Sequence, residues 1–421
     1  MSARARDEIL AYLDNDARGP RLVGSLRRAG SGQRADLAFE YASPWVDESG
    51  AFTLEPSLNL IPGEQRRTGG GLHGIFSDAA PDQWGRRLLE RRELYLARRE
   101  RRAARSLDDW DFLVGVNDAT RMGALRFART AGGPFVDDQP LAVPPKTSLR
   151  TLEVIAARLE RGDRASDEEI GRWLEQLIAP GASLGGARPK ASFDNGDGGL
   201  WIAKFPSAND RRDVGAWEYV ENRLAERAGI TVPEVDLLVF GDGYHTFVAR
   251  RFDRDGANRR LFASAMTLLD QRDHAEGVSY LDLARAIERY GSPSKAAINA
   301  DLEQLFRRVV FNALAGHRDD HLRNHGFLHD GRGWRIAPAF DLNPIPDKHE
   351  HELSFDGKST LPDLGLIITT AELYRLSPRR AEAVVAEVRA AVTTWRDVAR
   401  AAGLGRDERD LVAPAYSAIA A

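Results

Sequence analysis

The stretch HRDDHLRN, residues 317–324, decides the fold, because it places several kinds of reactive side chain in one short segment after a helix. Apolar residues recur before it at positions i, i+3 and i+4, so we predict a helix over 300–316 that ends near Gly316. Asp319 carries a carboxylate that can accept a proton from an attacking hydroxyl. Asn324 carries an amide oxygen, a ligand type that Mg²⁺ prefers. The stretch therefore predicts a loop that orients a hydroxyl beside a metal ion.

A second acidic residue follows in the segment IAPAFDL, residues 336–342. Asp341 comes directly after an apolar, strand-like run and could supply the second oxygen ligand of the same metal ion. Taken alone, the segment favours the alternative, a structural Asp that caps the turn before Pro344. Only the combination with the other three features favours the metal ligand.

Upstream, residues 181–190 read GASLGGARPK. Glycines allow successive backbone N–H groups to approach a phosphate, and Lys190 adds a mobile positive charge. The spacing is not that of a Walker A loop, and a glycine-rich segment of this kind also occurs as a plain flexible turn. The segment predicts a phosphate-binding loop only in combination with the other features.

Lys204 lies inside the apolar strand WIAKFP, residues 201–206. A buried ammonium group is costly without an anion, and a nucleotide phosphate would supply one. Taken alone, the strand favours the alternative, a Lys on an edge strand that points to water and discourages pairing with another sheet. Only the glycine-rich segment that precedes Lys204 favours the phosphate.

Composition narrows the choice of function. The chain has 421 residues with a net charge of −4, which argues against a broadly basic nucleic-acid binder. It has no cysteine, which excludes disulfides, thiolate catalysis and Cys-based metal sites. Only six of the 59 basic residues are Lys, so each of the six can be considered individually. No long apolar segment or signal core is present, and we expect a cytoplasmic protein with no membrane partner.

The chain-wide pattern predicts a mixed N-terminal part, a small strand-rich part and a larger helical part. Strands are expected at 22–26, 37–39, 200–205, 235–240 and 246–252, and a Pro- and Gly-rich linker at 130–148. Helices are expected at roughly 84–105, 150–178, 213–228, 279–290 and 300–316, with one long helix over 379–402.

In this order, the glycine-rich loop, the strand Lys, the H-R-D-x4-N stretch and the later Asp resemble protein kinases, and most closely the HipA family of serine/threonine kinase toxins. The family's S-x-x-G-x-x-x-K loop resembles residues 183–190. Its D-x-H-x-K-N segment resembles residues 319–324, with Arg323 in place of Lys. Its E-R-F-D-R hinge is similar to residues 250–254, with Arg250 in place of the acid. Segments such as GALRF, residues 123–127, extend the resemblance into the N-terminal part.

The resemblance implies a role for each matching residue. Nucleotide binding falls to Gly185, Gly186, Ala187, Arg188, Lys190, Lys204, Arg251 and Phe252. Catalysis falls to Asp319, His321 and Arg323, and Mg²⁺ binding to Asn324 and Asp341. Autophosphorylation falls to Ser183, and either Glu218 or Glu221 pairs with Lys204.

The implied architecture is an α+β, protein-kinase-like fold of two lobes, with a β-rich N-lobe and an all-helical C-lobe, behind an N-terminal mixed α/β domain of HipA type. We place the N-terminal domain at 18–130, the N-lobe with the glycine-rich loop at 150–255, and the helical C-lobe with the catalytic loop at 256–421.

The implied function is that of an ATP- and Mg²⁺-dependent serine/threonine protein kinase, the toxin of a toxin–antitoxin pair. A HipB-like helix-turn-helix antitoxin would bind it, and operator DNA would be contacted only through that complex. The implied substrate is a translation-related protein of the aminoacyl-tRNA synthetase class.

Two alternatives stay open at this point. His317, His321 and His325 are spaced at i, i+4 and i+8, which on a helix would place three imidazoles on one face, as in a metal-dependent hydrolase. A non-catalytic relative that only binds the antitoxin as a co-repressor would show the same motifs.

Overall fold

The computed structural model describes residues 6–30, 35–138, 143–163, 165–181, 186–241, 243–272 and 277–419. Ser183 and Gly185, both predicted site residues, lie outside these ranges. The chain forms two compact units. Unit 1 comprises Met1–Ala208 and Asp253–Ala263, and unit 2 comprises Asn209–Phe252 and Ser264–Ala421. The three domain boundaries expected from the sequence stay a prediction.

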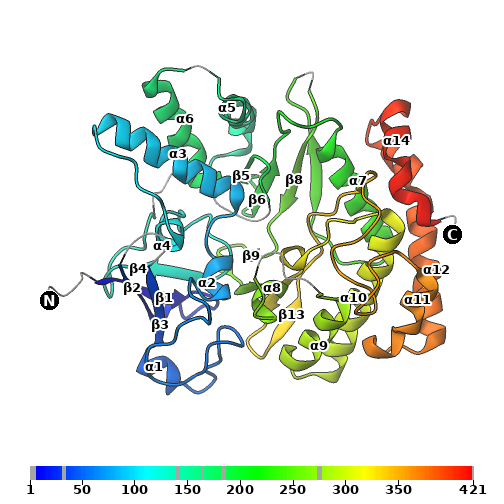
Figure 1. Cartoon of the computed structure of the whole chain (residues 1–421), viewed down its shortest axis with the longest axis horizontal. Coiled ribbons are helices and arrows are strands. Elements are labelled where there is room, and N and C mark those ends of the chain that lie inside the picture. The colour runs from blue at the N-terminus through cyan, green and yellow to red at the C-terminus, as the bar shows by residue number, and fades with distance from the viewer. Residues whose placement is uncertain are drawn as a thin grey trace. The chain divides into compact units, whose positions relative to one another are not determined.

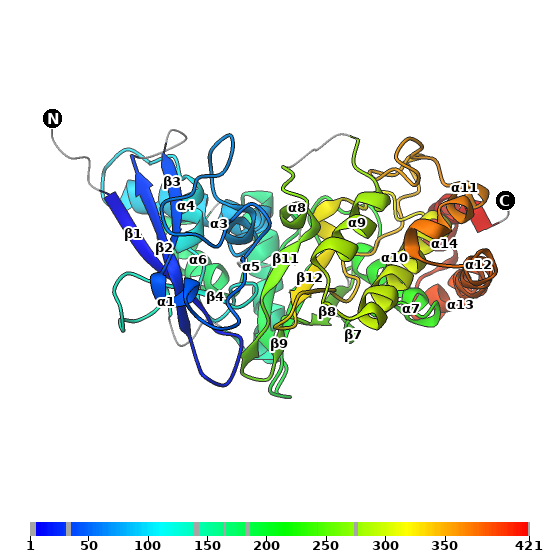
Figure 2. The ribbon, with the colours of Figure 1, turned by 90° about the horizontal axis from the view of Figure 1, so that it is seen from below.

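Unit 1 begins with a four-stranded antiparallel sheet of order β3-β2-β1-β4, whose strands lie side by side in Figure 2. In β1, Ile9, Ala11 and Leu13 are fully buried while the residues between them are not, which is the alternation of a sheet with one face on the core. The strands are β1 (Arg6–Leu13), β2 (Arg21–Ala29), β3 (Asp36–Tyr41) and β4 (Leu125–Ala128).

Helices and a hairpin complete unit 1. The hairpin β5–β6 is antiparallel, and α6 packs against both α3 and β5. The helices are α1 (Ser43–Val46), α2 (Gly74–Asp78), α3 (Gln83–Arg99), α4 (Asp109–Val114), a 3-10 turn (Lys146–Ser148), α5 (Leu149–Arg161) and α6 (Asp167–Gly181). The strands are β5 (Lys190–Asp194), β6 (Leu200–Lys204), β9 (Arg254–Asp255) and β10 (Asn258–Arg259).

The segment 253–263 returns to unit 1 from far along the chain. The carboxylate of Asp253, fully buried, accepts a hydrogen bond from the backbone N–H of Gly123 at 2.8 Å. Arg259 donates to the carboxylate of Asp118 at 3.0 Å, within the unit's interior. Buried charges of this kind are stable only when paired, so the returning segment is an integral part of unit 1.

Unit 2 is built around α10, which packs against α9 and α12 (Figure 1). Its elements start with α7 (Val214–Arg227), β7 (Val235–Leu238), β8 (Thr246–Arg250), α8 (Ala265–Leu268), α9 (Tyr280–Tyr290) and α10 (Lys295–Ala315). They continue with a 3-10 turn (Leu322–Asn324), β12 (Gly326–His329), β13 (Trp334–Ile336), α11 (Leu364–Thr369) and a 3-10 turn (Ala371–Tyr374). The last are α12 (Pro378–Thr393), α13 (Trp395–Ala401), α14 (Arg406–Val412) and a 3-10 segment (Ala413–Ile419). Strand β11 (Phe262–Ser264) spans the point where the chain passes between the units.

The predicted α+β class is confirmed, with two corrections. The C-terminal lobe is not all-helical, because the antiparallel hairpin β12–β13 follows the loop 317–324. The single helix expected over 379–402 is two helices, α12 and α13. The hydroxyl of Thr394 donates to the carbonyl of Ala391 at 2.7 Å, which competes with the helical backbone pattern between them. Within the described ranges, no helix combines the length and the apolar character that crossing a membrane requires.

Candidate active site

The loop 317–324 starts at Gly316, where α10 ends in a left-handed turn with φ of 66°. Glycine is required there for two reasons. The conformation is strained for other residues, and a Cβ would collide with the carbonyl oxygen of Ala415. The predicted end of the helix is therefore confirmed, and the loop leaves α10 in a fixed direction.

The two adjacent aspartates of the loop have opposite environments. The side chain of Asp319 is 64% exposed, whereas that of Asp320 is 3% exposed. Only Asp319 is accessible to a substrate hydroxyl, so its environment fits the predicted proton acceptor and that of Asp320 fits a structural anchor.

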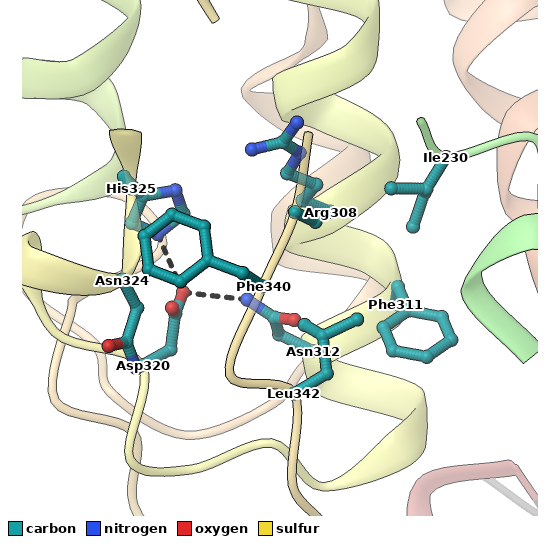
Figure 3. Close-up of a pocket in the computed structure, with 10 residues that line it drawn as sticks. Ile230, Arg308, Phe311, Asn312, Asp320, Asn324, His325, Phe340 and Leu342 are labelled. Carbon is teal, nitrogen blue, oxygen red and sulfur yellow. Dashed lines mark hydrogen bonds and ion pairs between the residues drawn. The ribbon is translucent and has the colours of Figure 1, made fainter. Parts of the chain in front are cut away.

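Asp320 is the centre of a buried polar cluster, in which His325 and Asn312 contact its carboxylate (Figure 3). It accepts hydrogen bonds from the hydroxyl of Tyr280 at 2.8 Å, the amide of Asn312 at 2.6 Å and the Nε2 of His325 at 2.8 Å. His317 Nε2 forms an ion pair with it at 3.5 Å. Burial opposes ionisation of Asp320, but the two imidazoles outweigh it and hold its pKa well below the usual range. The same ion pair, against the opposing effect of burial, raises the pKa of His317 to about 9.

These contacts decide against the arrangement expected for a hydrolase. Residues 317–325 do not form an α-helix, His317 and His325 both face Asp320, and His321 is exposed. The expected face of three imidazoles is therefore wrong. Among the residues that the structure describes, no group of three His, Asp or Glu side chains is placed to hold a metal ion.

Asn324 is held by the loop it belongs to. Its amide nitrogen donates to the carbonyl of Asp319 at 3.1 Å, and its backbone N–H donates to His321 at 2.9 Å. The amide nitrogen is thus committed to the loop, and the amide oxygen is the atom suited to a hard cation.

Asp341 adopts an uncommon backbone conformation with φ of 59°, which costs free energy in a residue other than Gly. Its neighbours Phe340 and Leu342 line a small pocket together with Asn324 (Figure 3). Farther along the same segment, the carbonyl of Asn343 accepts a hydrogen bond from Nδ1 of His317 at 3.0 Å. The hairpin β12–β13 therefore returns the chain to the loop 317–324. The carboxylate of Asp341 and the amide oxygen of Asn324 are of the ligand type that Mg²⁺ prefers.

Sequence patterns did not point to Lys348, which joins this site. Its Nζ lies 3.8 Å from Oδ1 of Asp319 and also pairs with Glu352. The signal available in the sequence was the scarcity of Lys, because a Lys in so Arg-rich a chain invites an explanation. Arg323 and His321, which were predicted to be catalytic, are both exposed.

The predicted nucleotide hinge lies partly in unit 2. The side chain of Arg251 is buried, and the ring of Phe252 packs against that of Phe340 with centroids 5.4 Å apart. Phe252 is thus adjacent, within this unit, to the segment that carries Asp341.

Glu221, one of the two candidate partners of Lys204, is fully buried on α7 and accepts a hydrogen bond from the hydroxyl of Tyr416. Burial raises its pKa to about 8. Glu218 is also buried. The choice between them stays a prediction.

Glu221→Gln should stabilise the protein increasingly as the pH rises. A carboxyl whose pKa is raised on folding keeps its proton longer in the folded state, so wild-type stability falls by up to about 1.4 kcal/mol per pH unit between the unfolded and folded pKa values. Gln keeps the acceptor for Tyr416 without the charge. Urea unfolding should give similar free energies for both proteins near about pH 5 and a clear advantage for the variant near about pH 8. Glu226→Gln, on the exposed side of the same helix, serves as the control. An equal difference at both pH values would contradict the prediction.

In unit 1, Lys190 and Lys204 are direct partners across the β5–β6 hairpin. Their side chains are 1% and 8% exposed. Lys204 is therefore not a surface Lys pointing to water, and that alternative is wrong. Gly186 is exposed with φ of 45°, and Ala187 and Arg188 are half-buried. Lys190 forms an ion pair with Asp82, a partner that the sequence did not reveal.

Two family models match separate parts of the chain. Residues 182–395 match the family model of the HipA-like C-terminal domain, and residues 18–128 match that of the HipA N-terminal domain. A Haemophilus influenzae protein named "Putative kinase" is 29% identical over 192 residues, which are 40% of this chain and 54% of that protein. The serine/threonine-protein kinase toxin HipA of Shewanella oneidensis is 25% identical over 234 residues, 48% of this chain and 51% of the toxin. The alignments thus span about half the length of these two relatives.

Among solved structures, the complex of Shewanella oneidensis HipA, HipB and operator DNA contains a chain with the same fold. It matches with a TM-score of 0.66 at 17% identity, covering 98% of this chain and 95% of that one.

Proposed function

This chain belongs to the HipA family, and from that premise we propose that it is an ATP- and Mg²⁺-dependent serine/threonine protein kinase, the toxin of a toxin–antitoxin pair. The observation that carries the proposal is the contrast between exposed Asp319 and buried Asp320 in one loop. A structural loop needs only the buried anchor, whereas an exposed carboxylate fixed by such an anchor is what a proton acceptor requires.

The proposed reaction is an in-line transfer with little covalent work by the protein. Asp319 orients the substrate's serine or threonine hydroxyl and accepts its proton. The bond from the hydroxyl oxygen to the γ-phosphorus forms as the bond to ADP breaks. Asn324 and Asp341 would hold Mg²⁺, which when bound neutralises phosphate charge. Lys204 would pair with the α- and β-phosphates, as the strand Lys of protein kinases does.

Cationic groups around the loop have a supporting role in this proposal. Lys348, close to Asp319, would attract the transferred phosphate toward the acceptor, and His321 and Arg323 are exposed on the same loop. The ammonium group of Lys348 suits this role because its flexible side chain can follow the phosphate as the phosphate moves during transfer.

The proposed partners follow from the family. A HipB-like helix-turn-helix antitoxin would restrain the kinase, operator DNA would be bound through that complex, and the substrate would belong to the aminoacyl-tRNA synthetase class. Autophosphorylation of Ser183 would place negative charge in the glycine-rich loop and switch the enzyme off by repelling ATP.

Purified full-length protein with Mg²⁺ and γ-labelled ATP tests the proposal. Label should appear on a serine or threonine of the chain itself and of a protein in a lysate of its host. Growth arrest on induction should be relieved by co-expression of the antitoxin. A protein that binds the antitoxin but transfers no phosphate would instead be a co-repressor, and that result would refute the kinase assignment.

A further inference from the structure

A buried ion pair joins Lys190, where the glycine-rich loop ends and β5 begins, to Asp82 of the N-terminal domain. Asp82 is the N-cap of α3, and its Oδ1 accepts a hydrogen bond from the backbone N–H of Gly85 at 2.9 Å. Its Oδ2 pairs with Nζ of Lys190, which also donates to the carbonyl of Gly186 at 3.1 Å. The Lys190 side chain is 1% exposed, so the pair is formed inside the protein.

Trp84, in the first turn of α3, strengthens the same contact. Its backbone N–H donates to the carbonyl of Gly186 at 3.4 Å, and its indole Nε1 donates to the carbonyl of Lys190 at 3.2 Å. The start of α3 therefore contacts both ends of the segment 186–190, although α3 and this segment are about a hundred residues apart in the sequence.

Charge explains why Asp82 has to be acidic. Lys190 lies directly opposite Lys204 in the hairpin, and two like charges at such positions repel each other. Asp82 compensates the charge of Lys190 where water is excluded. Burial raises the pKa of Asp82 to about 6 even though Lys190 acts in the opposite direction. Removal of one member of a buried pair leaves the other charge uncompensated.

We propose that Asp82 is a positioning residue for nucleotide binding: through Lys190 and Gly186 it fixes the end of the glycine-rich loop. In this arrangement Lys190 is a structural part of the loop, and Lys204 is the Lys that serves the nucleotide. The inference rests on the proposed function, because it assumes that residues 186–190 lie next to bound ATP.

The decisive experiment compares Asp82→Asn and Lys190→Met. Asn keeps an oxygen for the N–H of Gly85 but loses the charge. We expect both variants to bind the non-hydrolysable analogue AMP-PNP with Mg²⁺ about tenfold more weakly, with a similar rise in the KM for ATP and kcat within about twofold of wild type. The double variant should be no weaker than either single variant, because both changes break one interaction. Asp82→Glu should restore part of the affinity.

The two variants distinguish this proposal from the alternative that Lys190 itself binds the phosphates. If Lys190 itself held the phosphates, Asp82→Asn would release it and tighten binding, while Lys190→Met would weaken binding. Opposite signs would therefore overturn the proposal, as would unchanged affinity for AMP-PNP in both variants. A fall in kcat with unchanged KM and a lowered Tm would also overturn it, because that pattern reports structure alone. Asp363→Asn, at the exposed N-cap of α11, controls for loss of a capping charge and should bind normally.

Nucleotide binding and phosphate transfer are measured separately, so the two proposals fail differently. A wild-type protein that binds AMP-PNP but transfers no phosphate refutes the kinase and leaves the role of Asp82 measurable. A wild-type protein that transfers phosphate, with variants that keep their affinity, refutes only the role of Asp82.

Discussion

Asp319→Asn should lower kcat for phosphate transfer by about 10³-fold, within the range usual for loss of a general base. The amide cannot accept the proton, but it has nearly the same shape. The side chain is 64% exposed, so the free energy of unfolding should change little. The KM for ATP should also be retained, because the change affects the acceptor hydroxyl. Single-turnover transfer from γ-labelled ATP is the measurement.

Substitution of the neighbouring residue Asp320 should instead lower the free energy of unfolding. Asp320→Asn leaves His317 and His325 without their buried counter-charge and should lower the free energy of unfolding by about 3 kcal/mol. Asp330→Asn, in an exposed turn, should affect neither quantity. Wild-type transfer by Asp319→Asn would remove the catalytic assignment of this loop.

Substitution of Asp341 by residues that keep its backbone conformation should lower kcat strongly. Its φ of 59° is a conformation that Asn tolerates and Gly adopts without strain. Asp341→Asn and Asp341→Gly should both reduce kcat by about 10²-fold or more, because the proposed ligand of Mg²⁺ loses its charge. Both variants should stay folded, because neither residue is strained at that φ.

This pair of variants distinguishes a metal ligand from a turn-capping residue. A capping Asp would be replaced by Asn with little effect, since both side chains accept backbone hydrogen bonds. Activity retained in Asp341→Asn would therefore support the capping role. Raising the Mg²⁺ concentration should partly restore Asp341→Asn, and the absence of any such effect would argue against metal binding.

Local features of the fold could be predicted from the sequence. The helix before residue 317 follows from its apolar period, and Gly316 marks its end. Strand β6 follows from a short apolar run. The division of the last long helix did not follow, because the helical spacing of its apolar residues continues across the break at Thr394. The hairpin β12–β13 was not predicted, because its strands are only four and three residues long.

The sequence predicted which types of residue form the site, but it did not predict which side chains contact one another. Adjacent Asp319 and Asp320 look alike in a sequence, and only packing assigns one to solvent and the other to the cluster of Tyr280, Asn312 and the two histidines. The pair of Asp82 and Lys190 joins positions with no shared pattern. The conformation of Asp341 follows from its surroundings and has no signature in composition.

The returning segment 253–263 has a consequence for how such genes can be recombined. It is encoded within the region that matches the HipA-like C-terminal domain, yet Asp253 and Arg259 complete the interior of unit 1. A chimera joined in the Pro- and Gly-rich stretch near residue 140 would inherit its N-terminal half from one parent and the buried partners of that half from the other. An exchange of N-terminal domains between relatives would therefore succeed only if residues 253–263 were exchanged together with the N-terminal domain. The two halves of the gene are accordingly expected to be inherited together.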